Sequence, residues 1–145
     1  MSSGCVLVVE DNQDDQLLTL RALRKQGFEN PIVVKNDGVE ALEFLRTVAS
    51  DEDVPLPARI LMDLKMPRID GHEVLKQIKG DSRLRPIPVV LLTSSRELRD
   101  IACAYDLGAN SYVRKPVDSQ KFNDVAHHLC QYWLDINETA AAVEA

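Results

Sequence analysis

Acidic side chains follow two apolar runs of this sequence. Glu10 and Asp11 come directly after the valine-rich run at residues 5–9, and Asp63 follows the run at residues 59–62. A carboxylate at the end of a buried segment is costly unless a metal, a cation or chemistry on its own oxygen compensates the lost hydration. Oxygen ligands with no histidine or cysteine nearby are those that Mg²⁺ prefers. The implied ligands are the carboxylates of Asp11 and Asp63 and the backbone carbonyl of Lys65, with Glu10 acting directly or through water.

Two further polar groups follow later apolar runs. Thr93 comes after the run at residues 89–92, and Lys115 lies just past the short run at residues 111–113. A hydroxyl group and an ammonium group stabilise the oxygens of a bound or transferring phosphoryl group. A metal ion beside them would orient such a transfer, so Asp63 is placed to act as a nucleophile.

An alternation of strands and helices must position these residues. Short runs rich in valine, isoleucine and leucine predict buried strands, and apolar residues that recur with the period of a helix predict the segments between them. Strands are expected at residues 5–9, 31–35, 59–62, 89–92 and 111–113. Helices are expected at residues 13–26 and 97–105, after Gly38, after Gly71, and after Asp118 as N-cap.

Two of these helices carry specific predictions about burial. The helix at residues 97–105 is expected to bury Leu98, Ile101, Ala102 and Tyr105. The last helix has the most regular apolar stripe, formed by Phe122, Val125, Ala126, Leu129, Cys130 and Trp133. The three cysteines lack the spacing of a zinc or redox site, so small buried side chains are expected at Cys5, Cys103 and Cys130.

This alternation predicts an α/β fold with a doubly wound, five-stranded parallel sheet and five helices, because right-handed crossovers place helices on both faces. The usual flavodoxin-like strand order is 2-1-3-4-5, and ligands bind beyond the carboxyl ends of strands 1 and 3. Strand 2 then lies on the far side of strand 1. Asp37, at the end of strand 2, should therefore be too remote to join the site.

Composition excludes several classes of function. A chain of 145 residues with 45% hydrophobic and 28% charged residues is typical of one globular domain. A net charge of −6 without basic runs argues against nucleic acid as a partner. The apolar runs are too short for a membrane partner or span, and the first residues do not resemble a signal peptide, so a cytoplasmic protein is expected.

The candidate residues also occur in a recognisable order. The set is Glu10-Asp11, Asp63, Thr93, Tyr112 and Lys115-Pro116. Over residues 5–133 the chain resembles the receiver domain of two-component response regulators. The resemblance implies that a sensor histidine kinase transfers a phosphoryl group to Asp63 with Mg²⁺, that Thr93 and Tyr112 then move together as a switch, and that the Lys115–Pro116 bond is cis. It implies a phosphoacceptor that catalyses only its own phosphorylation and dephosphorylation, not an enzyme acting on other substrates.

Two stretches narrow the resemblance. Residues 104–112 and 131–134 are similar to the small regulators that partner bacterial and cyanobacterial phytochromes. That similarity implies a phytochrome as the kinase and a homodimer formed through the fourth helix, the fifth strand and the fifth helix. Residues 4–134 are then the receiver domain, and the alanine-rich, acidic residues 135–145 form a tail that would serve as a dimer arm.

Two alternatives compete with this interpretation. The first is a small Mg²⁺-dependent phosphatase with Asp63 as transient nucleophile, which usually needs a second acid where this chain has Lys65. The second is a pseudo-receiver, which keeps the fold as a binding scaffold without being phosphorylated. The intact set of acidic residues argues against it. No functional role is expected for His72, His127 or His128, which lie away from the predicted strand ends.

Overall fold

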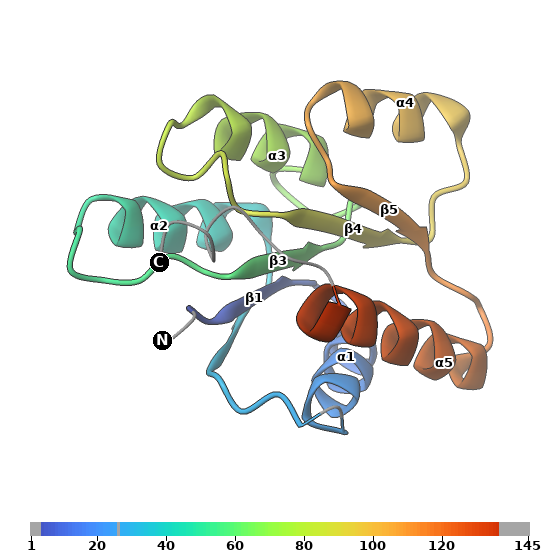
Figure 1. The fold of residues 1–145 in the computed structure, drawn as a ribbon. Coiled ribbons are helices and arrows are strands. Elements are labelled where there is room, and N and C mark those ends of the chain that lie inside the picture. The colour runs from blue at the N-terminus through green and yellow to red at the C-terminus, as the bar shows by residue number, and fades with distance from the viewer. Residues whose placement is uncertain (1–3, 26, 137–145) are drawn as a thin grey trace.

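The computed structural model describes residues 4–25 and 27–136, which form a parallel sheet flanked by helices (Figure 1). The strands are hydrogen-bonded in the order β2-β1-β3-β4-β5, which confirms the predicted fold class and strand order. The strands are β1 (Val6–Val9), β2 (Ile32–Lys35), β3 (Arg59–Met62), β4 (Val89–Thr93) and β5 (Ser111–Arg114).

In the described residues, five α-helices alternate with the strands, as predicted. They are α1 (Gln13–Lys25), α2 (Gly38–Ala49), α3 (Gly71–Gly80), α4 (Leu98–Asp106) and α5 (Ser119–Cys130). The chain continues from α5 as a π-helical segment, Gln131–Ile136. Residues 137–145, which make up most of the predicted tail, lie outside the described residues.

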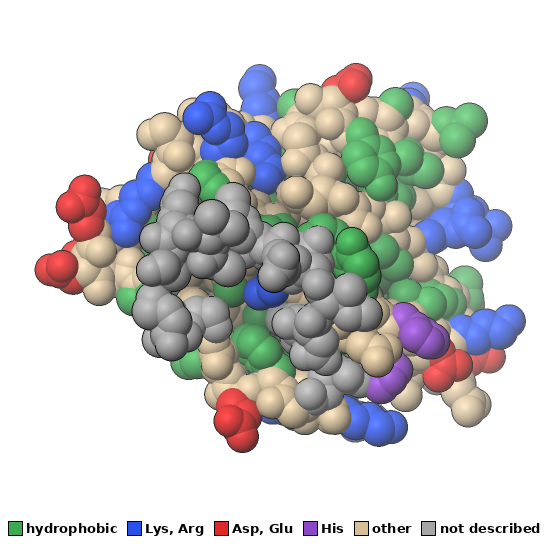
Figure 2. Space-filling model, viewed as in Figure 1, with side chains coloured by type: hydrophobic (Ala, Val, Ile, Leu, Met, Phe, Trp, Pro, Cys, Tyr) green, Lys and Arg blue, Asp and Glu red, His purple; other side chains and the backbone are tan. Residues whose placement is uncertain are grey.

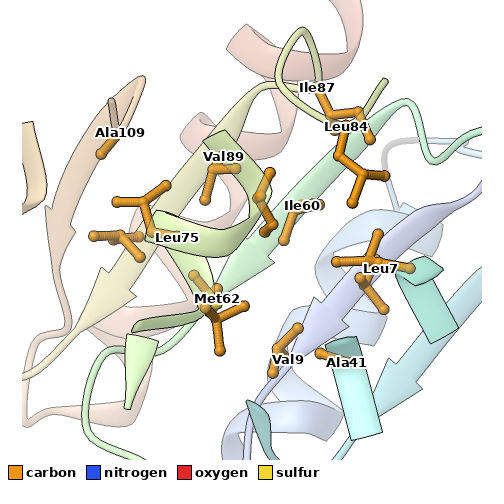
Figure 3. Packing of buried hydrophobic residues seen from close by; sticks show 14 of the residues in the cluster. Leu7, Val9, Ala41, Ile60, Met62, Leu75, Leu84, Ile87, Val89 and Ala109 are labelled. Atoms are coloured by element: carbon orange, nitrogen blue, oxygen red, sulfur yellow. The ribbon is translucent and has the colours of Figure 1, made fainter. Parts of the chain in front are cut away.

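The helices cover both faces of the sheet: α1 and α5 pack on one face, and α2, α3 and α4 on the other (Figure 1). Successive side chains of a strand point to opposite faces, so β1 contributes to two cores. Leu7 and Val9 belong to the core under α2 and α3, where they lie near Ala41 (Figure 3). Val6 and Val8 belong to the core under α1 and α5. A strand buried on both faces therefore requires the continuous apolar run seen in the sequence.

Acidic N-caps set the start of three helices. The Asp37 side chain accepts a hydrogen bond from the backbone N–H of Glu40, and Asp70 plays the same part for α3. Asp118 accepts hydrogen bonds from two backbone N–H groups at the start of α5, as predicted. Each carboxylate satisfies N–H groups that have no partner within the helix.

The π-helical segment that follows α5 is hydrogen-bonded to the first residue of β3. The Arg59 Nε donates a hydrogen bond to the backbone carbonyl of Trp133. Arg59 is the first residue of β3, and Trp133 packs partly buried against the core that α5 covers. The predicted stripe of α5 is confirmed, because its members Phe122 and Ala126 are buried in that core.

The predicted buried face of α4 is wrong. Leu98 is 82% exposed and Tyr105 is 51% exposed. The helix instead buries Asp100 and Ala104, which lie one turn apart on the opposite face. Apolar spacing alone misled the prediction, because a carboxylate can be buried where other elements supply hydrogen-bond and charge partners.

The three cysteines differ in their exposure to solvent. Cys130 is buried as predicted, but Cys5 is half-buried and Cys103 is exposed on α4. The Lys115–Pro116 peptide bond is trans, contrary to the expectation from the family resemblance. Among the described residues, no helix combines the length and the apolar character needed to cross a bilayer.

Candidate functional site

Three carboxylates meet at the carboxyl edge of β1 and β3. Neighbouring strands in register bring the chain segments that follow them together, and the backbone N–H of Asp63 donates to the carbonyl of Val9 at 2.9 Å. One oxygen from each of Glu10, Asp11 and Asp63 lies within 4.8 Å of the others. Glu10 and Asp63 are buried, whereas Asp11 is exposed. An all-oxygen donor set of this kind fits a hard divalent cation.

Both oxygens of the Asp63 carboxylate have hydrogen-bond partners. Oδ1 accepts from the backbone N–H of Leu64 at 2.6 Å and from that of Lys65 at 3.4 Å. Oδ2 accepts from Nζ of Lys115 at 3.1 Å. These contacts fix the orientation of the carboxylate, and they come from the turn after β3 and from the end of β5.

Lys115 joins the carboxylates together. Its Nζ lies 2.5 Å from Oε1 of Glu10, 2.8 Å from Oδ2 of Asp15 and 3.1 Å from Oδ2 of Asp63. The Lys115 side chain is only 8% exposed, so each contact operates away from bulk water. The backbone N–H of Lys115 donates to the carbonyl of Thr93 at 2.7 Å, which places the lysine beside the end of β4.

Burial and charge oppose each other at this cluster. Burial by itself lowers the pKa of Lys115, but its hydrogen bonds to Asp15 and Glu10 and the charge of Asp63 raise that pKa well above its ordinary value. Burial, together with the charge of Asp63, raises the pKa of Glu10 to about 7. The contact with Lys115 opposes this rise. The described groups at the site thus bring an excess of negative charge around one ammonium group, which favours an added cation.

Comparison with known proteins decides the family. Residues 6–127 match the response regulator receiver domain. The chain belongs to this family. It is 33% identical to the response regulator Rcp1 of Synechocystis sp., over 94% of this chain and 93% of the relative. It is 40% identical to a probable methanogenesis regulatory protein, FilR2 of Methanothrix harundinacea, over 92% of this chain and 86% of the relative.

Solved receiver structures show the same fold. The phosphorylated cyanobacterial phytochrome response regulator RcpA is 33% identical, with a TM-score of 0.88, over 96% of this chain and 99% of that one. The Mn²⁺-bound form of Rcp1 is 32% identical, with a TM-score of 0.86, over 94% and 98% of the two chains. The bacteriophytochrome response regulator AtBRR is 42% identical, with a TM-score of 0.72, over 95% and 96%.

Ser95 links the two predicted switch residues of this receiver domain. Thr93 is completely buried, and its Oγ1 lies 3.5 Å from the backbone N–H of Ser95, a long contact. The hydroxyl of Tyr112 donates to the carbonyl of Ser95 at 3.1 Å. Tyr112 is half-buried and packs against the core. A shift of the loop after β4 would therefore change the surroundings of both residues.

Asp15 is the site residue that sequence reasoning missed. It lies in the first turn of α1, and its carboxylate contacts Lys115. Its position in the first turn of the helix that starts just after Glu10 and Asp11 is the available signal, because that turn begins at the carboxyl end of β1. The prediction considered only the residues next to the strand ends.

Asp37 and His72 lie outside the acidic cluster of Glu10, Asp11 and Asp63. Asp37 pairs with Arg68 at 2.5 Å and caps α2, so its carboxylate is occupied outside the acidic group of Glu10, Asp11 and Asp63, as expected. His72, for which no role was expected, has its Nε2 3.0 Å from the backbone carbonyl of Asp100 on α4.

Proposed function

We propose that this receiver domain accepts a phosphoryl group on Asp63 from a sensor histidine kinase and signals through changed protein contacts. The observation that carries the proposal is the Asp63 carboxylate, fixed by backbone N–H groups on one oxygen and by Lys115 on the other. Glu10 and Asp11 lie beside it as further oxygen ligands. We propose Asp63 as the phosphoacceptor because it combines burial, orientation and metal-binding neighbours.

The transfer is a displacement at phosphorus. An oxygen of Asp63 forms the new P–O bond while the P–N bond of the donor phosphohistidine breaks, and the electron pair of that bond leaves with the imidazole nitrogen. Lys115 neutralises charge on the phosphoryl oxygens, and the Thr93 hydroxyl donates a hydrogen bond to one of them. When bound, Mg²⁺ would be held by Asp11, Asp63 and the Lys65 carbonyl, with Glu10 directly or through water, and would stabilise negative charge on the phosphoryl group.

The output would begin at Thr93. Its long contact with the Ser95 N–H is weak, so little is lost when the hydroxyl turns to the phosphoryl group. Tyr112 holds the carbonyl of Ser95 and would respond to the same loop movement. We propose that Thr93 and Tyr112 act together as the switch that passes the signal to α4 and β5.

Phosphorylation by a small donor tests the proposal directly. The protein is incubated with Mg²⁺ and acetyl phosphate and then weighed by mass spectrometry. We expect an adduct of one phosphoryl group in the wild type and none in Asp63→Asn. No adduct in the wild type, or an adduct that survives the substitution, contradicts the proposal.

We propose that the chain is a switch and not a phosphatase for external substrates. A phosphatase of this kind needs an acid two residues after the nucleophile, to protonate the leaving group. That position is Lys65, whose Nζ lies 3.2 Å from Asp100. Turnover of a general phosphate ester that depends on Asp63 would support the enzyme instead.

The relatives and the surface of α4 support proposals for the partners and the assembly. Because similar solved regulators are described as phytochrome response regulators, we propose a phytochrome as the kinase. We also propose a cytoplasmic location for this receiver domain. We propose a homodimer through α4, β5 and α5, which exposed Leu98 and Tyr105 on α4 support, with residues 4–134 as the receiver domain and residues 135–145 as a dimer arm. Size measurement with and without beryllofluoride and Mg²⁺ tests both the dimer and its dependence on phosphorylation.

A further inference from the structure

A buried carboxylate on α4 has no part in the acidic site. The Asp100 side chain is only 10% exposed, although charged side chains are rarely buried without partners. Its Oδ2 accepts a hydrogen bond from Oγ of Ser95 at 2.5 Å and lies 3.2 Å from Nζ of Lys65. The Nε2 of His72 lies 3.0 Å from its backbone carbonyl.

These contacts reach Asp100 from three separate elements. Lys65 comes from the turn after β3, Ser95 from the loop after β4, and His72 from α3. The hydrogen bond from Ser95 is the main cause that holds the pKa of Asp100 below its ordinary value, and Lys65 adds to it. Asp100 is therefore ionised at neutral pH and contacts both loops from the first turn of α4.

Lys65 connects Asp100 to the proposed phosphoacceptor. Its backbone N–H lies 3.4 Å from Oδ1 of Asp63, while its ammonium group lies against Asp100. The Lys65 side chain is 58% exposed, so its pairing with Asp100 is weak and easily exchanged for another anion. A phosphoryl group on Asp63 would be such an anion, only two residues away along the chain.

We propose that Asp100 is a positioning residue that competes with the phosphoryl group on Asp63 for Lys65, and so couples α4 to phosphorylation. The inference rests on the proposed function. When Lys65 turns to the phosphoryl group, its ion pair with Asp100 breaks. The first turn of α4 then loses its contact with the turn after β3. By linkage, a change that weakens the contact between Asp100 and Lys65 must strengthen binding of a phosphoryl group. Binding of a phosphoryl group must in turn weaken that contact.

A double-mutant cycle tests the competition, with beryllofluoride and Mg²⁺ as the phosphoryl mimic and fluorine NMR of the bound mimic as the measurement. We expect Asp100→Asn to bind the mimic about two- to fivefold more tightly than the wild type, because Lys65 is released. In the Lys65→Met background, we expect Asp100→Asn to have no effect. A purely structural role of Asp100 would act equally in both backgrounds.

A matched control separates this contact from general electrostatics. Asp106→Asn removes the same charge from an exposed position of α4 and should leave affinity for the mimic unchanged. Lys65→Met changes an exposed side chain, so it tests the pair without endangering the fold. Hydrogen exchange adds a readout on α4 itself: the mimic should raise exchange in its first turn in the wild type but not in Lys65→Met.

Each outcome decides between the two proposals. A wild type that does not bind the mimic overturns the proposed function, and the coupling with it. If the wild type binds but Asp100→Asn has the same effect with and without Lys65, or Asp106→Asn matches it, only the coupling is overturned.

Discussion

At the scale of single residues, Lys115 carries the charge balance of the site. Three carboxylates contact its ammonium group, and one of them, Asp15, lies outside the acidic group of Glu10, Asp11 and Asp63. Asp15 can therefore hold Lys115 while the other two carboxylates engage a cation. The same contact neutralises part of the Lys115 charge, so less of that charge attracts an incoming phosphoryl donor.

Substitution of Asp15 should make phosphorylation faster. Asp15→Asn removes a competitor for Lys115 and lowers the repulsion of an anionic donor, so we expect the rate with acetyl phosphate to rise by about two- to tenfold. Asp14→Asn is the matched control, because Asp14 is exposed in the same helical turn. Equal rates for the two variants would show that the contact with Lys115 is irrelevant.

The Asp37 carboxylate, which caps α2 and pairs with Arg68, should make the free energy of unfolding depend on pH in the acid range. The pKa of Asp37 is lowered first by the backbone N–H of Glu40 and then by Arg68. A carboxyl group whose pKa is lower in the folded state stabilises the fold at pH values above its pKa in the unfolded chain, about 3.9. This contribution is lost as the pH falls through the pKa of the folded state. Urea unfolding at pH 7 and pH 3 should show a smaller pH effect in Asp37→Asn than in the wild type; an unchanged difference would contradict this.

At the scale of elements, α4 exposes two large hydrophobic side chains. Leu98 and Tyr105 point outward, and hydrophobic side chains are visible over α4 on the molecular surface (Figure 2). Side chains that add little to folding when exposed can still contribute to an interface once a partner covers them.

Replacement of Leu98 should weaken dimerisation without loss of stability. We expect Leu98→Ser to lower the dimer fraction in sedimentation, while its free energy of unfolding stays within about 0.5 kcal/mol of the wild type. Leu17→Ser is the control, because Leu17 is also exposed but lies on α1. A dimer that withstands Leu98→Ser but not Leu17→Ser would place the interface on α1.

The strands and the helix α4 show where sequence reasoning succeeds and fails. Strands such as β1 are buried on both faces, so their continuous apolar runs report their environment directly. Burial of Asp100 depends on Ser95 and Lys65, which lie in other loops, and helical periodicity cannot detect such partners. The contact of Asp15 with Lys115 likewise joins residues 100 positions apart.

At the scale of the whole molecule, negative charge concentrated at one edge of the sheet should make stability depend on divalent cations. A cation that binds only the folded state at ten times its dissociation constant stabilises by about 1.4 kcal/mol. At constant ionic strength, we expect Mg²⁺ to raise the free energy of unfolding of the wild type by this amount, measured as a higher urea midpoint.

Two variants define the origin of that effect. Asp11 is exposed, so Asp11→Asn should fold normally and lose most of the response to Mg²⁺. Asp53→Asn removes the same charge from an exposed loop and should keep the response. If both variants keep it, the cation acts elsewhere on the surface.

The hydrogen bond between Arg59 and Trp133 lies at the opposite end of β3 from the acidic site. β3 begins at Arg59 and delivers Asp63 about 13 Å farther on, at the rise of a parallel strand. The site where a kinase must approach therefore lies at one end of the strands, and Trp133, just past α5, lies at the other end. A partner that binds near Trp133 would therefore leave the phosphorylation site open to an incoming kinase.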